Sequence, residues 1–247
     1  MTEIGHTRSL ILQELSFVPN VEQLALIEGL ALFLNQRSFN DVFVLNGYAG
    51  TGKTSVMGAF VKALKELKIK TVVMAPTGRA AKVAANFALG NASTIHKRLF
   101  RGNSADPSNS AFFLAQNTER NTIFIVDEAS LITDGNSLNN SLLQQLVRYV
   151  YSGLECNMIL VGDSAQLPPV GQTSSQAIDP ERLRSLGLNP VYFSLTEPAR
   201  HASESGVLLN ATIARKFLTD GLPLENFSFY TSEADDVRFV DPAEMLD

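Results

Sequence analysis

A glycine-rich segment directly after an apolar run has the composition of a phosphate-binding loop. It reads Gly-Tyr-Ala-Gly-Thr-Gly-Lys-Thr over residues 47–54, after the apolar run at 42–45. The glycines let backbone N–H groups turn toward phosphate oxygens, and a helix that starts near Lys53 points its positive dipole end at them. Lys53 is expected to reach the β and γ phosphates, and the Thr54 hydroxyl to hold Mg²⁺. The loop residues predicted to bind a nucleoside triphosphate are Gly47, Ala49, Gly50, Thr51, Gly52, Lys53, Thr54 and Ser55.

An acidic pair follows a second apolar run. Asp127 and Glu128 come directly after the run at 123–126. At the end of a buried strand, Asp127 can hold Mg²⁺ through water, and Glu128 can orient and deprotonate the water that attacks the γ-phosphate. Acidic residues also often begin surface loops, so the pair is informative because it accompanies the phosphate-binding loop. The implied reaction is hydrolysis rather than phosphoryl transfer to a small molecule.

A third polar segment follows the apolar run at 159–161. Gln166 lies in it, two residues before Pro168 and Pro169. An amide on a stiff, proline-containing loop can sense the γ-phosphate and transmit its presence to whatever packs on that loop. A plain rigid turn is the alternative interpretation of the two prolines.

Apolar runs alternate with helical patterns along the chain. The predicted strands are 42–45, 71–75, 122–126, 158–161 and 191–195, and the predicted helices are 55–67, 79–89, 137–151, 180–186 and 205–218. This alternation predicts an α/β fold with a doubly wound, mainly parallel central sheet and functional loops at the carboxyl ends of its strands. An irregular insertion interrupts the pattern at about 101–118, and two further strands are predicted at 227–230 and 237–240.

Composition favours one large domain. The chain has 247 residues, of which 45% are hydrophobic, and we expect it to bury a substantial core. It has no apolar stretch of membrane-spanning length and no secretory leader pattern, so we expect a cytoplasmic protein without a membrane partner. Its single cysteine, Cys156, excludes a disulfide framework within the chain and is expected in the core.

Positive charge is concentrated in one region. Residues 53–101 contain ten Lys or Arg and one acidic residue, although the chain has a net charge of −5. Four of the lysines fit a solvated helix face, namely Lys62, Lys65, Lys68 and Lys70. The other basic residues after the phosphate-binding loop flank further motifs, which makes nucleic acid a candidate partner; they are Arg79, Lys82, Lys97, Arg98 and Arg101.

The three motifs, in this order, together with segments 75–81 and 94–99, resemble the N-terminal motor domain of superfamily 1 DNA helicases. The RecD-like branch, which includes the Pif and Dda helicases and translocates 5′ to 3′, is the most similar. The resemblance covers roughly residues 10–218. It implies a three-layer RecA-like P-loop NTPase domain over residues 1–218, with ATP and Mg²⁺ as cofactors and single-stranded DNA as partner.

The resemblance also assigns roles around the nucleotide. Gln23 lies in a segment similar to the family's leading glutamine motif and would hydrogen-bond the adenine edge; without the resemblance it reads as a helix-surface residue. Arg200 lies in a segment similar to the family's fourth motif and would stabilise transition-state charge. Ala199 and His201 replace the aromatic residue and the glutamine that more often flank this arginine. A surface salt bridge is the alternative role for Arg200.

Two segments resemble the DNA-binding motifs of the family. In the first, backbone groups near Pro76 and Thr77 would meet phosphates and Arg79 would add charge, unless its side chain is simply solvated. In the second, His96 would contact phosphate or base, and the alternative is a histidine that organises its loop. The insertion at 101–118 lies where this branch carries a small strand-separating hairpin. Its two phenylalanines, Phe112 and Phe113, could stack on bases, although packing in the core is favoured.

The sequence after Arg200 shows no pattern of a second motor domain. Residues 219–247 are acidic and are interpreted as the possible start of such a domain. We therefore expect a first motor domain alone, part of a longer helicase with unknown partner subunits, with slow hydrolysis, weak DNA affinity and no unwinding. The alternatives are a non-motor ATPase of the phosphate-starvation type that acts with RNA or a protein partner, a kinase, and a regulatory domain that binds ATP without turnover.

Overall fold

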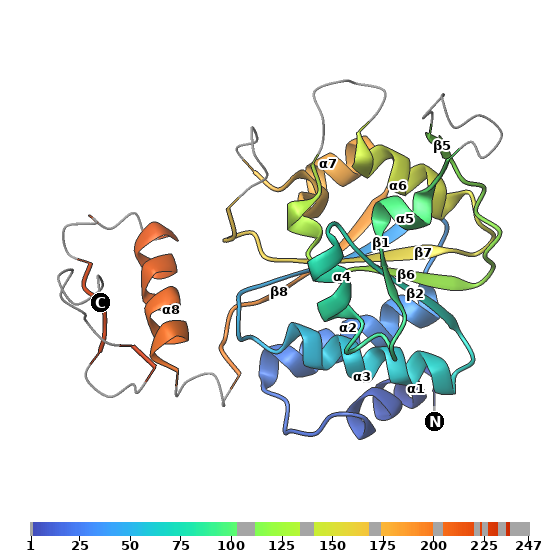
Figure 1. Ribbon diagram of the computed structural model, residues 1–247. Helices are drawn as coiled ribbons and strands as arrows, with labels where there is room; N and C mark the ends of the chain where they lie inside the picture. The colour runs from blue at the N-terminus through green and yellow to red at the C-terminus, as the bar shows by residue number, and fades with distance from the viewer. Residues whose placement is uncertain are drawn as a thin grey trace.

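The central feature of the structure is a six-stranded parallel sheet (Figure 1). The computed structural model describes residues 2–102, 112–133, 141–167, 174–199, 205–219, 223, 227–231 and 236–237. The strands of the sheet are β1 (Asp41–Gly47), β2 (Lys70–Ala75), β3 (Ala92–Thr94), β6 (Thr122–Val126), β7 (Asn157–Gly162) and β8 (Asn189–Leu195). Their order is β3-β2-β6-β7-β1-β8, and all neighbouring strands are parallel. The predicted α/β class with a mainly parallel sheet is confirmed.

Continuous apolar runs form these strands because both faces of the sheet are covered. Successive side chains of a strand point to opposite faces. In β1, Phe43 and Leu45 join one hydrophobic cluster, whereas Val42 and Val44 join the other. All four side chains are completely buried.

Helices form a layer on each face of the sheet, as Figure 1 shows. The first layer contains α1 (Glu3–Gln13), α2 (Val21–Gln36) and α3 (Lys53–Glu66), which contribute Ile11, Leu26 and Phe60 to one cluster. The second layer contains α5 (Ile95–Leu99), α6 (Leu142–Tyr151) and α7 (Pro180–Ser185), which contribute Leu99, Leu146 and Leu183 to the other. The fold is therefore three-layered, with α4 (Gly78–Ala84) beside β2 and β3.

The register of the strands places the predicted motifs together. Val126 of β6 pairs with Leu160 of β7, and Gly162 at the end of β7 pairs with Asn46 of β1. The residues that follow β1, β6 and β7 therefore emerge side by side at the carboxyl edge of the sheet. This edge is where open α/β sheets bind ligands.

The insertion contains a small sheet of its own. Strands β4 (Phe100–Gly102) and β5 (Phe112–Leu114) pair antiparallel, with Arg101 opposite Phe113. The Phe113 side chain is 59% exposed, so the core packing favoured for it is wrong. A three-residue strand in a two-stranded sheet has only one partner strand and buries little surface. Residues 103–111 and the side chain of Phe112 lie outside the described part of the chain.

The last described helix is α8 (Gly206–Thr219), close to the predicted 205–218. It lies apart from the two helical layers in Figure 1. The strand predicted at 227–230 is wrong, because these residues pair with no strand in the described part of the chain; most of the strand predicted at 237–240 lies outside the described residues. Its backbone instead pairs with the Asn210 side chain of α8, which accepts from Tyr230 N at 2.6 Å and donates to Tyr230 O at 2.8 Å.

Two shorter elements complete the described structure. They are the 3₁₀ turns η1 (Ala129–Leu131), directly after the acidic pair, and η2 (Gln176–Ile178). Within the described ranges, no helix has the length and apolar character needed to cross a membrane.

Candidate functional site

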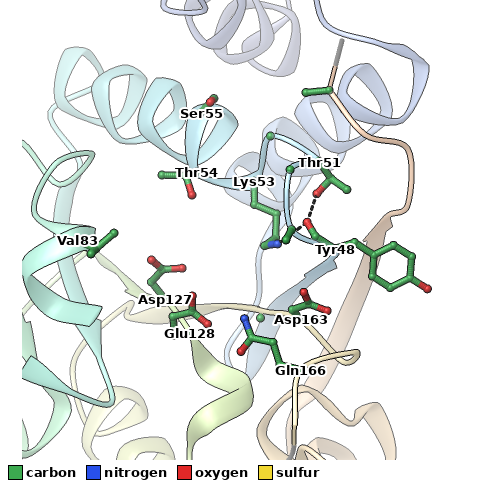
Figure 2. Close-up of a pocket in the computed structure, with 15 residues that line it drawn as sticks. Tyr48, Thr51, Lys53, Thr54, Ser55, Val83, Asp127, Glu128, Asp163 and Gln166 are labelled. Carbon is green, nitrogen blue, oxygen red and sulfur yellow. Dashed lines mark hydrogen bonds between the residues drawn. The ribbon is translucent and has the colours of Figure 1, made fainter. Parts of the chain in front are cut away.

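A pocket of about 530 Å³ opens at the carboxyl edge of the sheet, between the loops that follow β1, β6 and β7 (Figure 2). It brings together three motifs, and the first and the last of them are separated by more than 110 residues of sequence. The described residues that line it are Tyr48, Ala49, Gly50, Thr51, Gly52, Lys53, Thr54, Ser55, Val83, Asp127, Glu128, Gly162, Asp163, Gln166 and Ala199. All predicted loop residues except Gly47 are among them.

The loop after β1 takes the backbone path that its glycines allow. Gly50 and Gly52 have φ angles of 78° and 87°, a left-handed conformation that glycine adopts without strain. Gly52 ends the loop, and α3 begins at Lys53 with no side chain capping its first turn. The N–H groups at the start of α3 therefore lack intrahelical partners and face the pocket, as an anion site requires.

Lys53 is folded across the loop. Its Nζ donates to Gly47 O at 2.5 Å and to Tyr48 O at 2.8 Å. Burial lowers the pKa of its amine below the ordinary value, although Asp163, Glu128 and Asp127 favour the charged form. The ammonium group is thus held beside the space that the loop encloses.

Asp127 and Glu128 project into the pocket from the end of β6 (Figure 2). Burial, and then the charge of Glu128, raise the pKa of Asp127 to about 6. Glu128 has a left-handed φ of 53°, which costs a side-chain-bearing residue about 1–3 kcal/mol. Such strain is typical of functional positions. The pair provides the oxygen ligands that a hard divalent cation prefers, and a cation there would favour the charged carboxylates.

Gln166 lies on the turn after β7. Its side-chain Oε1 accepts a hydrogen bond of 3.4 Å from Ser130 Oγ, and its backbone N–H donates to Asp163 O at 3.2 Å. Ser130 belongs to η1, which starts directly after Glu128. The amide is therefore connected to the segment of the acidic pair, while the prolines at 168 and 169 lie outside the described residues.

Gln23 lies behind the loop rather than on a helix surface. Its side chain is 2% exposed, which excludes the surface interpretation. Its Nε2 donates to Thr51 O at 2.9 Å, and its Oε1 accepts from Asn20 N at 3.0 Å. A Cβ placed on Gly52 would lie 2.5 Å from Gln23 Nε2, and the φ of 87° would strain any other residue, so both features favour glycine there. Each end of the amide keeps one further hydrogen-bonding position.

Glu22 fixes the segment that follows β8. Its carboxylate accepts hydrogen bonds from Thr196 N at 2.7 Å, Thr196 Oγ1 at 2.5 Å and Glu197 N at 2.9 Å. Further along this segment, Ala199 N donates to Gly50 O at 2.8 Å, so the segment closes one wall of the pocket. Arg200 follows directly and lies outside the described residues, as do His201 and its neighbours up to 204.

Glu22→Ala is expected to lower the free energy of unfolding by about 0.5–1.5 kcal/mol, because two N–H donors and a hydroxyl lose their acceptor and water replaces it only in part. Burial raises the pKa of Glu22, but the three hydrogen bonds outweigh it, and the pKa lies below its ordinary value. The contribution is therefore present above the unfolded-state pKa of about 4.3 and lost as the pH falls through the lower folded-state pKa.

Denaturant unfolding of the Glu22→Ala variant and the parent, at pH 7 and near pH 3, measures this contribution. The stability difference should shrink at the acidic pH. Glu66, an exposed carboxylate on α3, provides the control, and Glu66→Ala should change stability by less than about 0.5 kcal/mol. Equal stability of Glu22→Ala and the parent at pH 7 would contradict the assigned role.

The predicted DNA-contacting residues lie at the same sheet edge. Thr77 follows β2 and caps α4, where its Oγ1 accepts from Ala80 N at 3.2 Å. Pro76 is half-buried, and Arg79 is exposed on α4. His96 is exposed on α5, with its ring 5.6 Å from that of Phe100. These residues lie at the same edge of the sheet as the pocket, but none of them lines it.

Several basic residues have protein partners. Lys70 and Arg98 both pair with Glu119, and Lys62 pairs with Glu14. The Arg101 guanidinium donates to backbone carbonyls, the shortest being Lys97 O at 2.9 Å. The helix-face interpretation is wrong for Lys70, which is the first residue of β2. The exposed basic residues near Thr77 and His96 are Arg79, Lys82 and Lys97.

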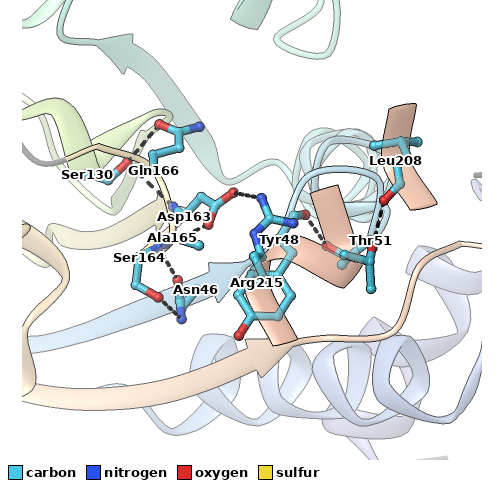
Figure 3. A network of polar contacts seen from close by, with 12 residues as sticks. Asn46, Tyr48, Thr51, Ser130, Asp163, Ser164, Ala165, Gln166, Leu208 and Arg215 are labelled. Carbon is cyan, nitrogen blue, oxygen red and sulfur yellow. Dashed lines mark hydrogen bonds and ion pairs between the residues drawn. The ribbon is translucent and has the colours of Figure 1, made fainter. Parts of the chain in front are cut away.

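Two residues of the site were not singled out from the sequence. Asp163 lines the pocket and is 1% exposed, and Arg215 of α8 pairs with it at 3.2 Å (Figure 3). The sequence did indicate Asp163 as a candidate site residue, because it directly follows the apolar run of β7. Nothing in the sequence indicated Arg215, since a single arginine on a helix does not show which surface the helix meets.

The fold and the pocket together define an α/β domain with a glycine-rich loop, a lysine and an acidic pair at the carboxyl edge of a parallel sheet. The family model described as an AAA domain matches residues 20–203. This is well over half of the chain, which therefore belongs to that family.

Two individual proteins are similar to the chain over somewhat more than 60% of its length. The chain is 31% identical over 159 residues to the ATP-dependent RecD2 DNA helicase of Deinococcus radiodurans, covering 62% of this chain and 20% of that protein. It is 28% identical over 179 residues to the uncharacterized protein R530 of Acanthamoeba polyphaga mimivirus, covering 63% and 34%. The chain thus spans about a third or less of these relatives.

Among solved structures, the Pif1 helicase from Candida albicans matches with a TM-score of 0.45 and 18% identity, covering 82% of this chain and 43% of that one. The family model and the similarity to the RecD2 helicase support the predicted resemblance to RecD-like helicases.

Proposed function

We propose that this chain is a motor domain of an ATP-dependent DNA helicase or translocase, which binds and hydrolyses Mg·ATP in the pocket described above. The observation that carries the proposal is the convergence of Lys53, Thr54, Asp127, Glu128 and Gln166 on one pocket. These residues come from three separate loops. A glycine-rich turn without a role in nucleotide binding would not be expected to face an acidic pair and an amide that follow two other strands.

The residues present fit a magnesium-bound triphosphate. The first turn of α3 offers uncapped N–H groups to phosphate oxygens, and Lys53 can exchange its two carbonyl partners for them. The hydroxyl of Thr54 and the carboxylate of Asp127 are suitable oxygen ligands for Mg²⁺. When bound, this ion would neutralise charge on the β and γ phosphates.

The remaining residues would orient the reaction. Glu128 would accept the proton of the attacking water, and Gln166 would hold the water or the γ-phosphate in place. Arg200, one residue beyond the pocket wall at Ala199, would stabilise charge in the transition state. Gln23 would read the adenine edge with the two hydrogen-bonding positions that remain on its amide.

Single-stranded DNA is the partner we propose. The helix N-termini after β2 and β3 and the exposed cations Arg79, Lys82 and Lys97 would hold its phosphates. His96 directly precedes Lys97, and Phe113 pairs with Arg101 in the small hairpin; both rings are exposed and could stack on bases. Pro76 and Thr77 would place backbone groups against phosphate. The 5′ to 3′ direction of movement is inferred from the resemblance to the RecD-like branch alone.

We further propose that unwinding needs a second motor domain. Alternating approach of two motor domains would convert hydrolysis into steps along DNA, and the matched part of this chain covers only 20% and 34% of the two relatives. This chain by itself is expected to bind nucleotide, to hydrolyse it slowly and to bind DNA weakly. Robust unwinding by the 247-residue chain would refute this part of the proposal.

Phe113→Ala tests the proposed binding of single-stranded DNA. If Phe113 stacks on a base, its loss should weaken binding of single-stranded DNA by about 1–3 kcal/mol, roughly five- to 150-fold. Fluorescence anisotropy with a labelled oligonucleotide at fixed low salt measures this change. Phe39 provides a matched control, because it is 69% exposed and precedes β1 at the opposite edge of the sheet. Equal losses for Phe39→Ala and Phe113→Ala would rule out a specific contact.

A further inference from the structure

Helix α8 brings a cation to the nucleotide pocket from a distant part of the chain. Arg215 lies in its penultimate turn, and the guanidinium Nη2 is 3.2 Å from Asp163 Oδ2. The same guanidinium lies 4.6 Å from the centre of the Tyr48 ring (Figure 3). The two side chains of this ion pair are 17% and 2% exposed, so the contact is largely shielded from water.

Asp163 needs such a partner. Its carboxylate lines the pocket together with Asp127 and Glu128, and Lys53 is the one basic residue among the described residues of the lining. Its Oδ1 accepts a hydrogen bond of 2.9 Å from Ala165 N, which leaves Oδ2 for Arg215. An unpaired, buried carboxylate at this place would repel the phosphates of a nucleotide.

Tyr48 connects the same cation to the phosphate-binding loop. It is the second residue of the loop, and its carbonyl accepts from Thr51 Oγ1 at 2.8 Å and from Lys53 Nζ at 2.8 Å. A guanidinium over its ring adds a cation–π contact that fixes the ring against α8. Arg215 therefore contacts two pocket residues, one that follows β1 and one that follows β7.

We propose that Arg215 is a positioning residue of the nucleotide site, which neutralises Asp163 and holds Tyr48 so that the loop accepts a triphosphate without repulsion from that carboxylate. The inference rests on the proposed function, because it presupposes that this pocket binds a nucleotide. It differs from the role of Arg200, which would touch the phosphates directly. By reciprocity, a bound nucleotide should also strengthen the docking of α8 on the domain.

The test is a binding experiment with Mg²⁺ and a fluorescent, non-hydrolysable ATP analogue. Arg215→Met keeps much of the side-chain volume and removes the charge, and it should raise the Kd about tenfold. In the double variant Arg215→Met, Asp163→Asn the repulsive charge is also gone, so its Kd should return to within about threefold of that of Asp163→Asn alone. Arg215→Lys keeps the charge and should lose less affinity than Arg215→Met.

Lys216 provides the matched control, because it is the next residue of α8 and its side chain is exposed. Lys216→Met removes the same charge from the same helix and should leave the Kd unchanged. Circular dichroism and thermal unfolding establish whether each variant is folded.

The outcomes separate the inference from the proposed function. If the parent chain does not bind the analogue, the proposed function fails. If the parent binds and folded Arg215→Met binds equally well, the positioning role is wrong. If Arg215→Met loses affinity and Asp163→Asn does not restore it, Arg215 acts only by docking α8, and the inference is again wrong. If Arg215→Met does not fold, Arg215→Lys decides: a tenfold loss in that folded variant would overturn the inference.

Discussion

Lys53→Ala is expected to lower kcat/KM for ATP hydrolysis by about 10²–10³-fold, the usual cost of removing one preorganised donor to developing phosphate charge. The effect should be large because Lys53 is the one basic residue among the described residues that line the pocket. Its ammonium already lies beside the loop, held by Gly47 O and Tyr48 O, and needs only to exchange these carbonyls for phosphate oxygens. Steady-state hydrolysis over a range of ATP concentrations measures the loss.

Lys62 provides a matched control for this substitution. It lies on the same helix, and it pairs with Glu14 at 3.1 Å on the protein surface, where exposed pairs contribute at most about 1 kcal/mol. Lys62→Ala should therefore leave hydrolysis unchanged. If Lys53→Ala hydrolysed ATP at the parental rate, the loop after β1 would not be the phosphate site.

Glu128→Gln is expected to lower the rate of hydrolysis by about 10²–10⁴-fold while nucleotide binding persists. The amide keeps the shape of the side chain but cannot accept the proton of the attacking water. Binding should be equal or tighter, because one negative charge is removed from a pocket that receives phosphates. Hydrolysis and analogue binding, measured on the same preparation, distinguish this result from a general loss of structure.

Glu155 offers an unusually close control for Glu128. Both are glutamates with a left-handed backbone, with φ angles of 55° and 53°, but Glu155 precedes β7 and so lies at the opposite edge of the sheet. Glu155→Gln should therefore retain full activity. A Glu128→Gln variant that was indistinguishable from the parent would instead favour a domain that binds ATP without turnover.

The sheet and the pocket were predictable for a physical reason. Strands covered on both faces, such as β1 and β7, are continuous apolar runs and stand out from the sequence. The polar motifs follow these runs directly. Because parallel strands end at one edge, residues as distant as Lys53 and Gln166 had to converge there.

Other contacts could not be predicted from the sequence. They join elements that are distant in sequence, and no local pattern indicates that these elements pack together. Glu22 reads as an ordinary first-turn carboxylate, yet it accepts hydrogen bonds from Thr196 and Glu197 after β8. Arg215 reads as a surface arginine of α8. In each case the partner is more than fifty residues away, and only the packed fold brings the two together.

The small hairpin and the segment after α8 have a different explanation. The phenylalanines of the hairpin were expected in the core, and residues 227–230 were expected to form a strand, but the described parts of these segments pack outside the central sheet. Phe113 is exposed, and Phe227 packs with Phe217 and Phe229, at ring distances of 5.6 and 5.0 Å. An apolar side chain indicates that some burial is favourable but does not identify the partner.

We propose that the pocket hydrolyses ATP and that single-stranded DNA at the neighbouring sheet edge accelerates this reaction. The most direct measurement is steady-state ATP hydrolysis by this chain with and without saturating single-stranded DNA, together with the Lys53→Ala and Glu128→Gln variants. We predict slow hydrolysis that DNA stimulates and that both substitutions abolish. Hydrolysis at the same rate with and without bound DNA would contradict the claim and favour an ATPase that is not a motor.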